Sequence, residues 1–134
     1  MKVVIDSYAW IELILGSEKG RKVKQILETA ESVYTPDTVL AELARKYTRE
    51  NVPEKTVRER LEMLHNVSHI LHITPEIALL AAQAYADLSI KAKQEHLNLP
   101  SLFDGIVLGA TRAKEAVVVT GDPHFRNLEE TMWI

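Results

Sequence analysis

The chain has 134 residues, 46% of them hydrophobic, which suits one domain with a core and excludes a disordered tail. It has no cysteine, which excludes disulfides and cysteine-based zinc sites and fits the reducing cytoplasm where we expect the protein. No apolar run approaches the ~20 residues of a membrane span, and a net charge of −3 argues against nucleic-acid binding through bulk positive charge alone.

Apolar runs and helical patterns alternate along the chain without repeats or Gly/Ser linkers, so residues 1–134 form a single predicted domain. Continuous β-branched runs predict buried strands, and amphipathic stretches predict helices. In chain order we expect a strand at 3–5, helices at 7–15 and 18–31, a strand at 33–35, helices at 36–49 and 53–66, a strand at 69–73, helices at 75–97 and 101–114, and strands at 117–119 and 132–134. This alternation predicts an α/β fold, a three-layer α/β/α sandwich with a mainly parallel central sheet.

Two of the predicted strands end in an aspartate. Residues 3–5 lead into Asp6, and residues 117–121 lead into Asp122. In an open parallel sheet the ligand crevice lies outside the carboxyl ends of the strands, so both aspartates are expected at that edge. Taken alone, each is better explained as an ordinary turn or helix-capping aspartate.

Glu42 lies on the helix that follows the second predicted strand. It stands outside the apolar stripe of that helix, on the flank shared with Arg45 and Lys46. The simple interpretation is an exposed ion pair with Arg45 or Lys46, worth ~0.2–0.5 kcal/mol. Since Glu42 is about two turns past the carboxyl end of a strand, it is also able to reach the crevice.

Asp104 follows Ser101 at the start of the last predicted helix, a spacing typical of a capping box. We expect Asp104 to point away from the buried face of this helix and a patch of Gly105 and Gly109 to allow close packing of a neighbouring element. The buried face is predicted to comprise Leu102, Phe103, Ile106, Val107 and Ala110.

The four acids together indicate more than any one of them. Clustered carboxylates repel one another and are unlikely to ionise together unless a cation is present. Oxygen ligands in a chain without cysteine favour Mg²⁺ or Mn²⁺, which can activate a water for phosphodiester hydrolysis. The predicted site is therefore a metal site formed by Asp6, Glu42, Asp104 and Asp122, with these residues also being catalytic. Offsetting four acids would leave the charge balance nearly even, so charge neither supports nor excludes an RNA substrate.

Around these acids the sequence resembles the PIN domain, and within it the VapC-type toxins of toxin–antitoxin pairs. Four segments match the family pattern in order, at residues 4–10, 35–43, 101–111 and 119–125. The resemblance implies a metal-dependent endoribonuclease, commonly a homodimer, that a partner antitoxin inhibits. By position it implies Asp6, Glu42 and Asp104 as the main metal ligands, with Asp122 completing the site. It also implies that Ser7 and Thr120 orient ligands or water.

Two other functions and several further residues stay open at this point. The domain could bind RNA or protein without catalysis, or process RNA as a housekeeping nuclease. His124 is interpreted as a solvated loop histidine, although its position near Asp122 would also allow contact with RNA. Six basic residues are candidates to hold phosphates at the crevice, although each alone is more simply a solvated charge. They are Arg45, Lys46, Arg49, Arg112, Lys114 and Arg126.

Overall fold

The apolar runs of the sequence form one sheet of five strands in a computed structural model that describes all residues, 1–134. The strand order is β3-β2-β1-β4-β5, and every neighbouring pair is parallel. The mainly parallel sheet that the sequence predicts is confirmed. The strands are β1 (Lys2–Ile5), β2 (Ser32–Pro36), β3 (His69–Leu71), β4 (Val117–Thr120) and β5 (Thr131–Trp133).

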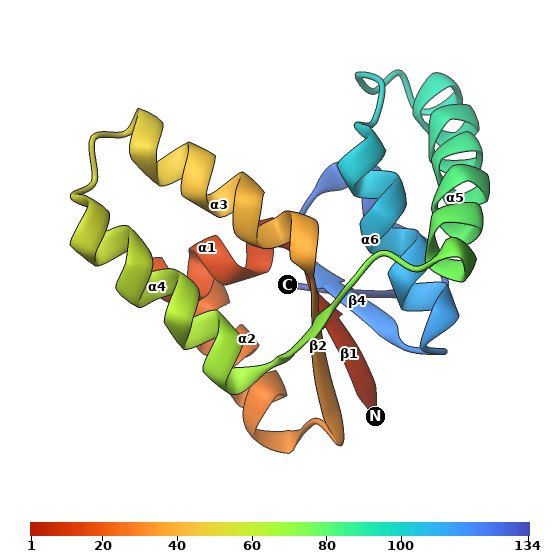
Figure 1. Cartoon of the computed structure of the whole chain (residues 1–134). Helices are drawn as coiled ribbons and strands as arrows, with labels where there is room; N and C mark the ends of the chain where they lie inside the picture. Colours follow the sequence, from red (N-terminus) through yellow and green to blue (C-terminus); the bar gives the residue numbers. More distant parts are fainter.

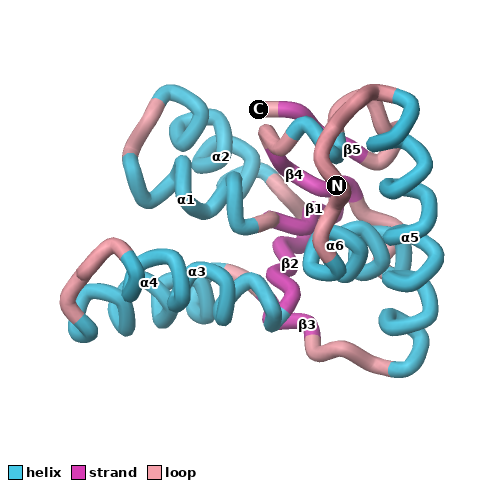
Figure 2. The backbone as a smooth tube through the Cα atoms, turned by 90° about the horizontal axis from the view of Figure 1, so that it is seen from above, coloured by secondary structure: helices cyan, strands magenta, loops and turns pink.

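Six helices cover the two faces of this sheet and give the expected α/β architecture (Figure 1). Figure 2 shows the sheet between α1–α4 on one side and α5 and α6 on the other. None of the helices combines the length and the apolar character that a membrane crossing requires. The helices are α1 (Ser7–Leu15), α2 (Glu18–Thr29), α3 (Asp37–Arg49), α4 (Glu54–Val67), α5 (Pro75–Gln94) and α6 (Leu102–Ala113), with a short 3-10 helix η1 (Pro123–Phe125).

The central strands supply the core because helices cover them on both faces. Val3, Val4 and Ile5 of β1 are fully buried. Trp10 of α1 is also fully buried, and its indole N–H donates to the Thr35 hydroxyl over 3.2 Å. A buried N–H that finds an acceptor avoids a desolvation penalty of about 1–3 kcal/mol. This bond therefore fixes α1 against β2, directly beside the carboxyl ends of the strands.

Helices α5 and α6 pack closely through two glycines of α6. A Cβ at Gly109 would lie 2.5 Å from the Ala81 nitrogen, and a Cβ at Gly105 would lie 2.9 Å from the Ala81 carbonyl oxygen. No side chain fits where the backbone of α5 already stands. The small-residue patch predicted from the sequence is thus the contact surface of α5.

Element boundaries differ from the prediction by a few residues. Pro36 is the last residue of β2, where it pairs with Leu71, and not the first residue of a helix. A strand end tolerates proline, because no further ladder hydrogen bond is needed there. Helix α5 ends at Gln94 and β3 at Leu71, both earlier than predicted.

The prediction for the first turn of α6 is wrong in two respects. Leu102 and Phe103 are 60% and 37% exposed, not buried, because this turn has no covering element. Asp104 does not point away from the core. It lies four residues before Leu108 and seven before Thr111, which are both fully buried, and so it continues a buried line of the helix.

Candidate active site

The two aspartates that end predicted strands lie side by side, as the sequence predicts. Strands β1 and β4 are neighbours, with Ile5 opposite Val119, which brings Asp6 against Thr120. The Thr120 hydroxyl donates to Oδ2 of Asp6 and accepts from the backbone N–H of Asp122 over 3.0 Å. One hydroxyl thereby links both acids, which agrees with the orienting role that the family resemblance implies for Thr120.

Asp6 is held rigidly and lies almost out of contact with water. Its exposed fraction is 4%, and Oδ1 accepts from the backbone N–H of Ala9 over 2.9 Å, which caps α1. Burial raises the pKa of Asp6 to about 7. The hydrogen bonds from Thr120 and Ala9 oppose the rise, and the charges of Asp122 and Asp104 add to it.

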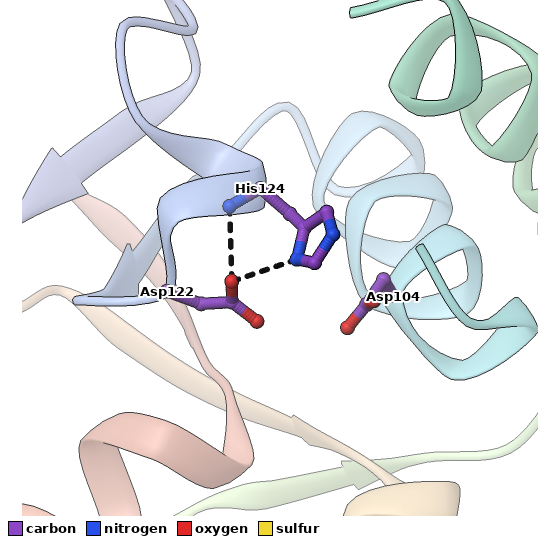
Figure 3. A group of neighbouring side chains, drawn as sticks. All are labelled: Asp104, Asp122 and His124. Atoms are coloured by element: carbon purple, nitrogen blue, oxygen red, sulfur yellow. Dashed lines mark hydrogen bonds and ion pairs between the residues drawn. The ribbon is translucent and has the colours of Figure 1, made fainter. Parts of the chain in front are cut away.

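Asp104 and Asp122 face each other across the crevice from α6 and from the segment after β4 (Figure 3). Ligand atoms of Asp104, Asp122 and His124 all lie within 4.8 Å of one another. Oδ2 of Asp104 accepts from the backbone N–H of Ser101 over 2.9 Å, which completes the predicted capping box. Burial raises the pKa of Asp104, and Asp122 adds to the rise while the Ser101 bonds oppose it.

His124 is part of the site and is not the solvated loop residue that the sequence suggested. Its Nδ1 lies 3.0 Å from Oδ1 of Asp122, and its Nε2 lies 2.7 Å from the carbonyl oxygen of Asn98. Both partner atoms are acceptors, which favours the protonated ring that can donate from both nitrogens. Although burial opposes it, the bonds to Asn98 and Asp122 raise the pKa of His124. The two-residue spacing from Asp122, in a tight turn, was the signal available in the sequence.

Glu42 approaches the same group from α3. The ion pair expected with Arg45 or Lys46 is not formed, since Lys46 pairs with Glu50. Glu42 is half-buried, and this burial raises its pKa to about 7. Asp104 and Asp122 add to the rise, and Arg45 opposes it. Glu42 is therefore close enough to sense both of the other acids.

The structural and the chemical roles of the acids coexist. Asp6, Asp104 and Asp122 each cap a helix, as the simpler interpretation of the sequence held. Each cap uses only part of the carboxylate. Oδ1 of Asp104, Oδ2 of Asp122 and the carboxylate of Glu42 accept no hydrogen bond from the chain. An oxygen-rich group with suppressed ionisation can hold a divalent cation.

The structure separates the six basic candidates into two sets. Arg112 pairs with Asp87 and Glu130, while Lys114 and Arg126 lie over the rings of Tyr34 and Trp133. The other three, Arg45, Lys46 and Arg49, line a cleft between α1 and α3 that also contains Ser7 and Glu42. The largest cleft lies between α3 and α4 and contains none of the four acids.

Comparison with known proteins agrees with this geometry. The profile of the PIN domain matches residues 3–130, whereas no curated protein sequence matches the chain. The fold is similar to VapBC-1 from nontypeable Haemophilus influenzae, with a TM-score of 0.72 and 14% identity over 100% of this chain and 97% of that one. It is also similar to a toxin–antitoxin complex from Klebsiella pneumoniae, with a TM-score of 0.68 and 18% identity over 97% and 95% of the two chains.

A third similar structure is VapC20 from Mycobacterium tuberculosis, a toxin that cleaves the sarcin–ricin loop. Its TM-score is 0.66, with 18% identity over 92% of both chains. Identities this low support the shared fold, while the domain profile extends over nearly the whole sequence. The chain therefore belongs to the PIN-domain family.

Proposed function

We propose that this protein is a metal-dependent endoribonuclease and the toxin of a toxin–antitoxin pair. The observation that carries the proposal is the convergence of four carboxylates from four separate segments on one edge of the sheet. Three of them, Asp6, Glu42 and Asp104, have raised pKa values, chiefly because burial disfavours the charged form and in addition because neighbouring acids repel it. The toxins among the similar structures support the RNA substrate.

In this proposal Asp6, Glu42, Asp104 and Asp122 hold the cation. When bound, Mg²⁺ or Mn²⁺ would supply positive charge to the scissile phosphate and favour ionisation of the attacking water. The carboxylates suit these hard ions because all of the candidate ligands are oxygen atoms. Hydrolysis by an in-line water leaves a 5′-phosphate and a 3′-hydroxyl and needs no attack by the 2′-hydroxyl.

The residues around the acids keep each carboxylate oriented. Thr120 holds Oδ2 of Asp6, the Ser101 backbone holds Oδ2 of Asp104, and His124 holds Oδ1 of Asp122. Asp6 and Glu42, with pKa values of about 7, are partly protonated near neutral pH when no cation is present. Those protons must leave when a cation binds, because a carboxylate ligand is deprotonated.

The direct test is an RNA cleavage assay on the wild type and on Asp6→Asn and Asp104→Asn. Each substitution keeps the size of the side chain and removes its charge, so we expect each to lower activity at least about 100-fold while the protein stays folded. Asp87→Asn is the matched control, because Asp87 is exposed and pairs with Arg112 outside the acid cluster. This control should cleave like the wild type.

Addition of EDTA should abolish cleavage, and excess Mg²⁺ or Mn²⁺ should restore it. Product ends report the mechanism independently of the rate. Cleavage that survives EDTA, or products that end in a cyclic phosphate, would contradict the metal mechanism. Full activity in both active-site variants would restrict Asp6 and Asp104 to the capping roles.

The proposal includes a protein antitoxin and a homodimer. Toxin–antitoxin complexes among the similar structures support the antitoxin. The homodimer rests on the family resemblance alone, because Val57 and Leu64, the apolar residues of α4 that could have formed an interface, are buried in the core. Light scattering at high protein concentration tests the dimer, and co-purification with the product of an adjacent reading frame tests the antitoxin.

A further inference from the structure

The proposed chemistry leaves two features beside the acids unused. One is the pair of arginines Arg45 and Arg49 on α3, and the other is the exposed ring of Phe103 on α6. Figure 1 shows α3 and the start of α6 on opposite sides of the carboxyl end of the sheet. The acids therefore have a positive side and an aromatic side.

The positive side is formed by two arginines that have no acidic partner. Arg45 and Arg49 are exposed and form no ion pair, whereas their neighbour Lys46 pairs with Glu50. Both arginines line the cleft that contains Glu42, and Arg45 is close enough to influence the ionisation of Glu42. They stand one turn apart, a rise of ~6 Å along α3, which is comparable with the spacing of successive phosphates in an extended strand. Guanidinium groups bind phosphate in a bidentate manner.

The aromatic side is formed by Phe103, which is 37% exposed beside Asp104. At 100° per residue, Phe103 lies on the line of Val107 and Ala110, which are both buried. Phe103 directly precedes Asp104, whose ligand atoms lie within 4.8 Å of those of Asp122 and His124, so the exposed ring is next to the acid cluster. Leu102 instead lies on the line of Gly105 and Gly109, which face α5.

A charged track beside an exposed aromatic ring is the combination that binds single-stranded nucleic acid, where phosphates follow the charges and bases stack on the ring. We propose that single-stranded RNA crosses the acid cluster in one orientation, with backbone phosphates on Arg45 and Arg49 and one base stacked on Phe103. This inference rests on the proposed function, since it places the substrate of that same site.

The phosphate half is tested by fluorescence anisotropy with a labelled single-stranded RNA and the full chain carrying Asp6→Asn, which removes cleavage from the binding measurement. Arg45→Gln and Arg49→Gln, each added to this background, should weaken binding. Each should also lower the slope of log affinity against log salt by about 0.7, the value for one lost phosphate contact on a single strand. Arg21→Gln on α2 removes the same charge from an exposed arginine and should leave the slope unchanged.

The stacking half is tested by scanning 2-aminopurine through the same RNA. We expect quenching of its fluorescence at one position, loss of that quenching in Phe103→Ala, and its recovery in Phe103→Tyr. Phe103→Ala should also weaken binding about 5- to 100-fold. Leu102→Ala shortens an exposed apolar side chain in the same turn and should keep the quenching, so a merely structural effect of the turn would show in both variants.

Equal effects of Phe103→Ala and Leu102→Ala, or the absence of a quenched position, would overturn the stacking half. Unchanged salt slopes would overturn the phosphate half and would point to an acidic protein as the occupant of the arginine cleft. Failure of the proposed function can be distinguished from failure of this inference. Orientation-specific binding by a chain that never cleaves RNA would refute the enzyme and keep this inference. RNA cleavage that is insensitive to the Arg45, Arg49 and Phe103 variants would keep the proposed enzyme and refute this inference. Absence of RNA binding would refute both the enzyme and the inference.

Discussion

Helix α6 passes through two regions that are built on different principles. Its middle, residues 105–111, is buried throughout and touches α5 through Gly105 and Gly109. Its first turn lies open at the sheet edge, where Leu102 and Phe103 are exposed and Asp104 faces the other acids. Packing alone explains the middle, whereas packing explains neither an exposed aromatic ring nor three aspartates and a glutamate placed together.

The difference shows how one rigid element serves both stability and chemistry. The middle fixes the position of α6, because the backbones of α5 and α6 approach each other closely at Gly105 and Gly109. Because the first turn is continuous with the packed middle of the helix, its position is fixed as well, and Asp104 lies at the crevice. The acid cluster itself opposes folding, since burial and like charge suppress ionisation of Asp6, Glu42 and Asp104. Substitutions should therefore separate into those that change stability and those that change activity.

The largest change in stability is expected in the middle of α6, from Gly109→Ala. The added Cβ would lie 2.5 Å from the Ala81 nitrogen and 2.6 Å from its Cα, and a backbone atom cannot rotate away. We expect a loss of about 3 kcal/mol in the free energy of unfolding, measured with urea, with normal activity per folded molecule. Gly16→Ala is the comparison, since nothing lies within 4 Å of its Cβ and only its φ of 68° is unfavourable, at about 1–2 kcal/mol. A smaller loss at Gly109 than at Gly16 would show that the two helices can separate easily.

The next effect belongs to the crevice and depends on pH. Millimolar Mg²⁺ or Mn²⁺ should stabilise the protein by about 1–3 kcal/mol through linkage. Because Asp6 and Glu42 have pKa values of about 7 without a cation, binding must displace protons at pH 6 but few at pH 8. The rise in melting temperature should therefore be larger at pH 8 than at pH 6, and Asp104→Asn should reduce it at both. Equal shifts at the two pH values would contradict this account of the acids.

Glu42→Gln should stabilise the metal-free protein at alkaline pH. The pKa of Glu42 is raised from 4.5 to about 7, so between these values the folded state binds more protons than the unfolded state and stability falls as pH rises. Removal of the carboxylate should restore on the order of 1 kcal/mol at pH 8 in EDTA, with the difference vanishing near pH 4. Urea titrations at both pH values measure it. Glu59→Gln, at an exposed position of α4, should show no such pH dependence. A destabilised Glu42→Gln at pH 8 would place Glu42 outside the repulsive cluster.

The smallest effect is expected at the capping box of α6, where substitutions of Ser101 and Asp104 should affect stability and activity differently. The Ser101 hydroxyl accepts from the Asp104 backbone N–H over 3.2 Å, so Ser101→Ala should cost about 1 kcal/mol of stability. Most activity should remain, because the backbone of Ser101, and not its side chain, holds the Asp104 carboxylate. Asp104→Asn should show the opposite pattern. Urea unfolding and the RNA assay, applied to both variants, would reveal any overlap of the two roles.

Part of the site could be predicted from local sequence because parallel sheets place the carboxyl ends of their strands at one edge. Asp6 and Asp122 follow continuous apolar runs, and they lie beside each other for that reason. The capping box of Ser101 and Asp104 was equally visible, since it depends on a spacing of three residues. Gly105 and Gly109 predicted a close contact with a neighbouring element, but the sequence did not indicate that this element is α5.

Other features depended on neighbours that no local pattern specifies. Lys46 forms an ion pair with Glu50 and not with Glu42, so Glu42 stays unpaired beside the other acids. His124 bonds to the carbonyl oxygen of Asn98, 26 residues away, and this bond raises the pKa of His124 beside Asp122.

The sequence by itself determined the α/β order of elements, the strand ends that carry acids, and the caps, because periodicity and short-range hydrogen bonds need only a few consecutive residues. Tertiary structure alone decided that α6 begins beyond the sheet edge, which left Leu102 and Phe103 uncovered although the helical pattern predicted them as core. It also decided the raised pKa values of Asp6 and Glu42, because burial and charge depend on segments that meet only when the sheet has formed.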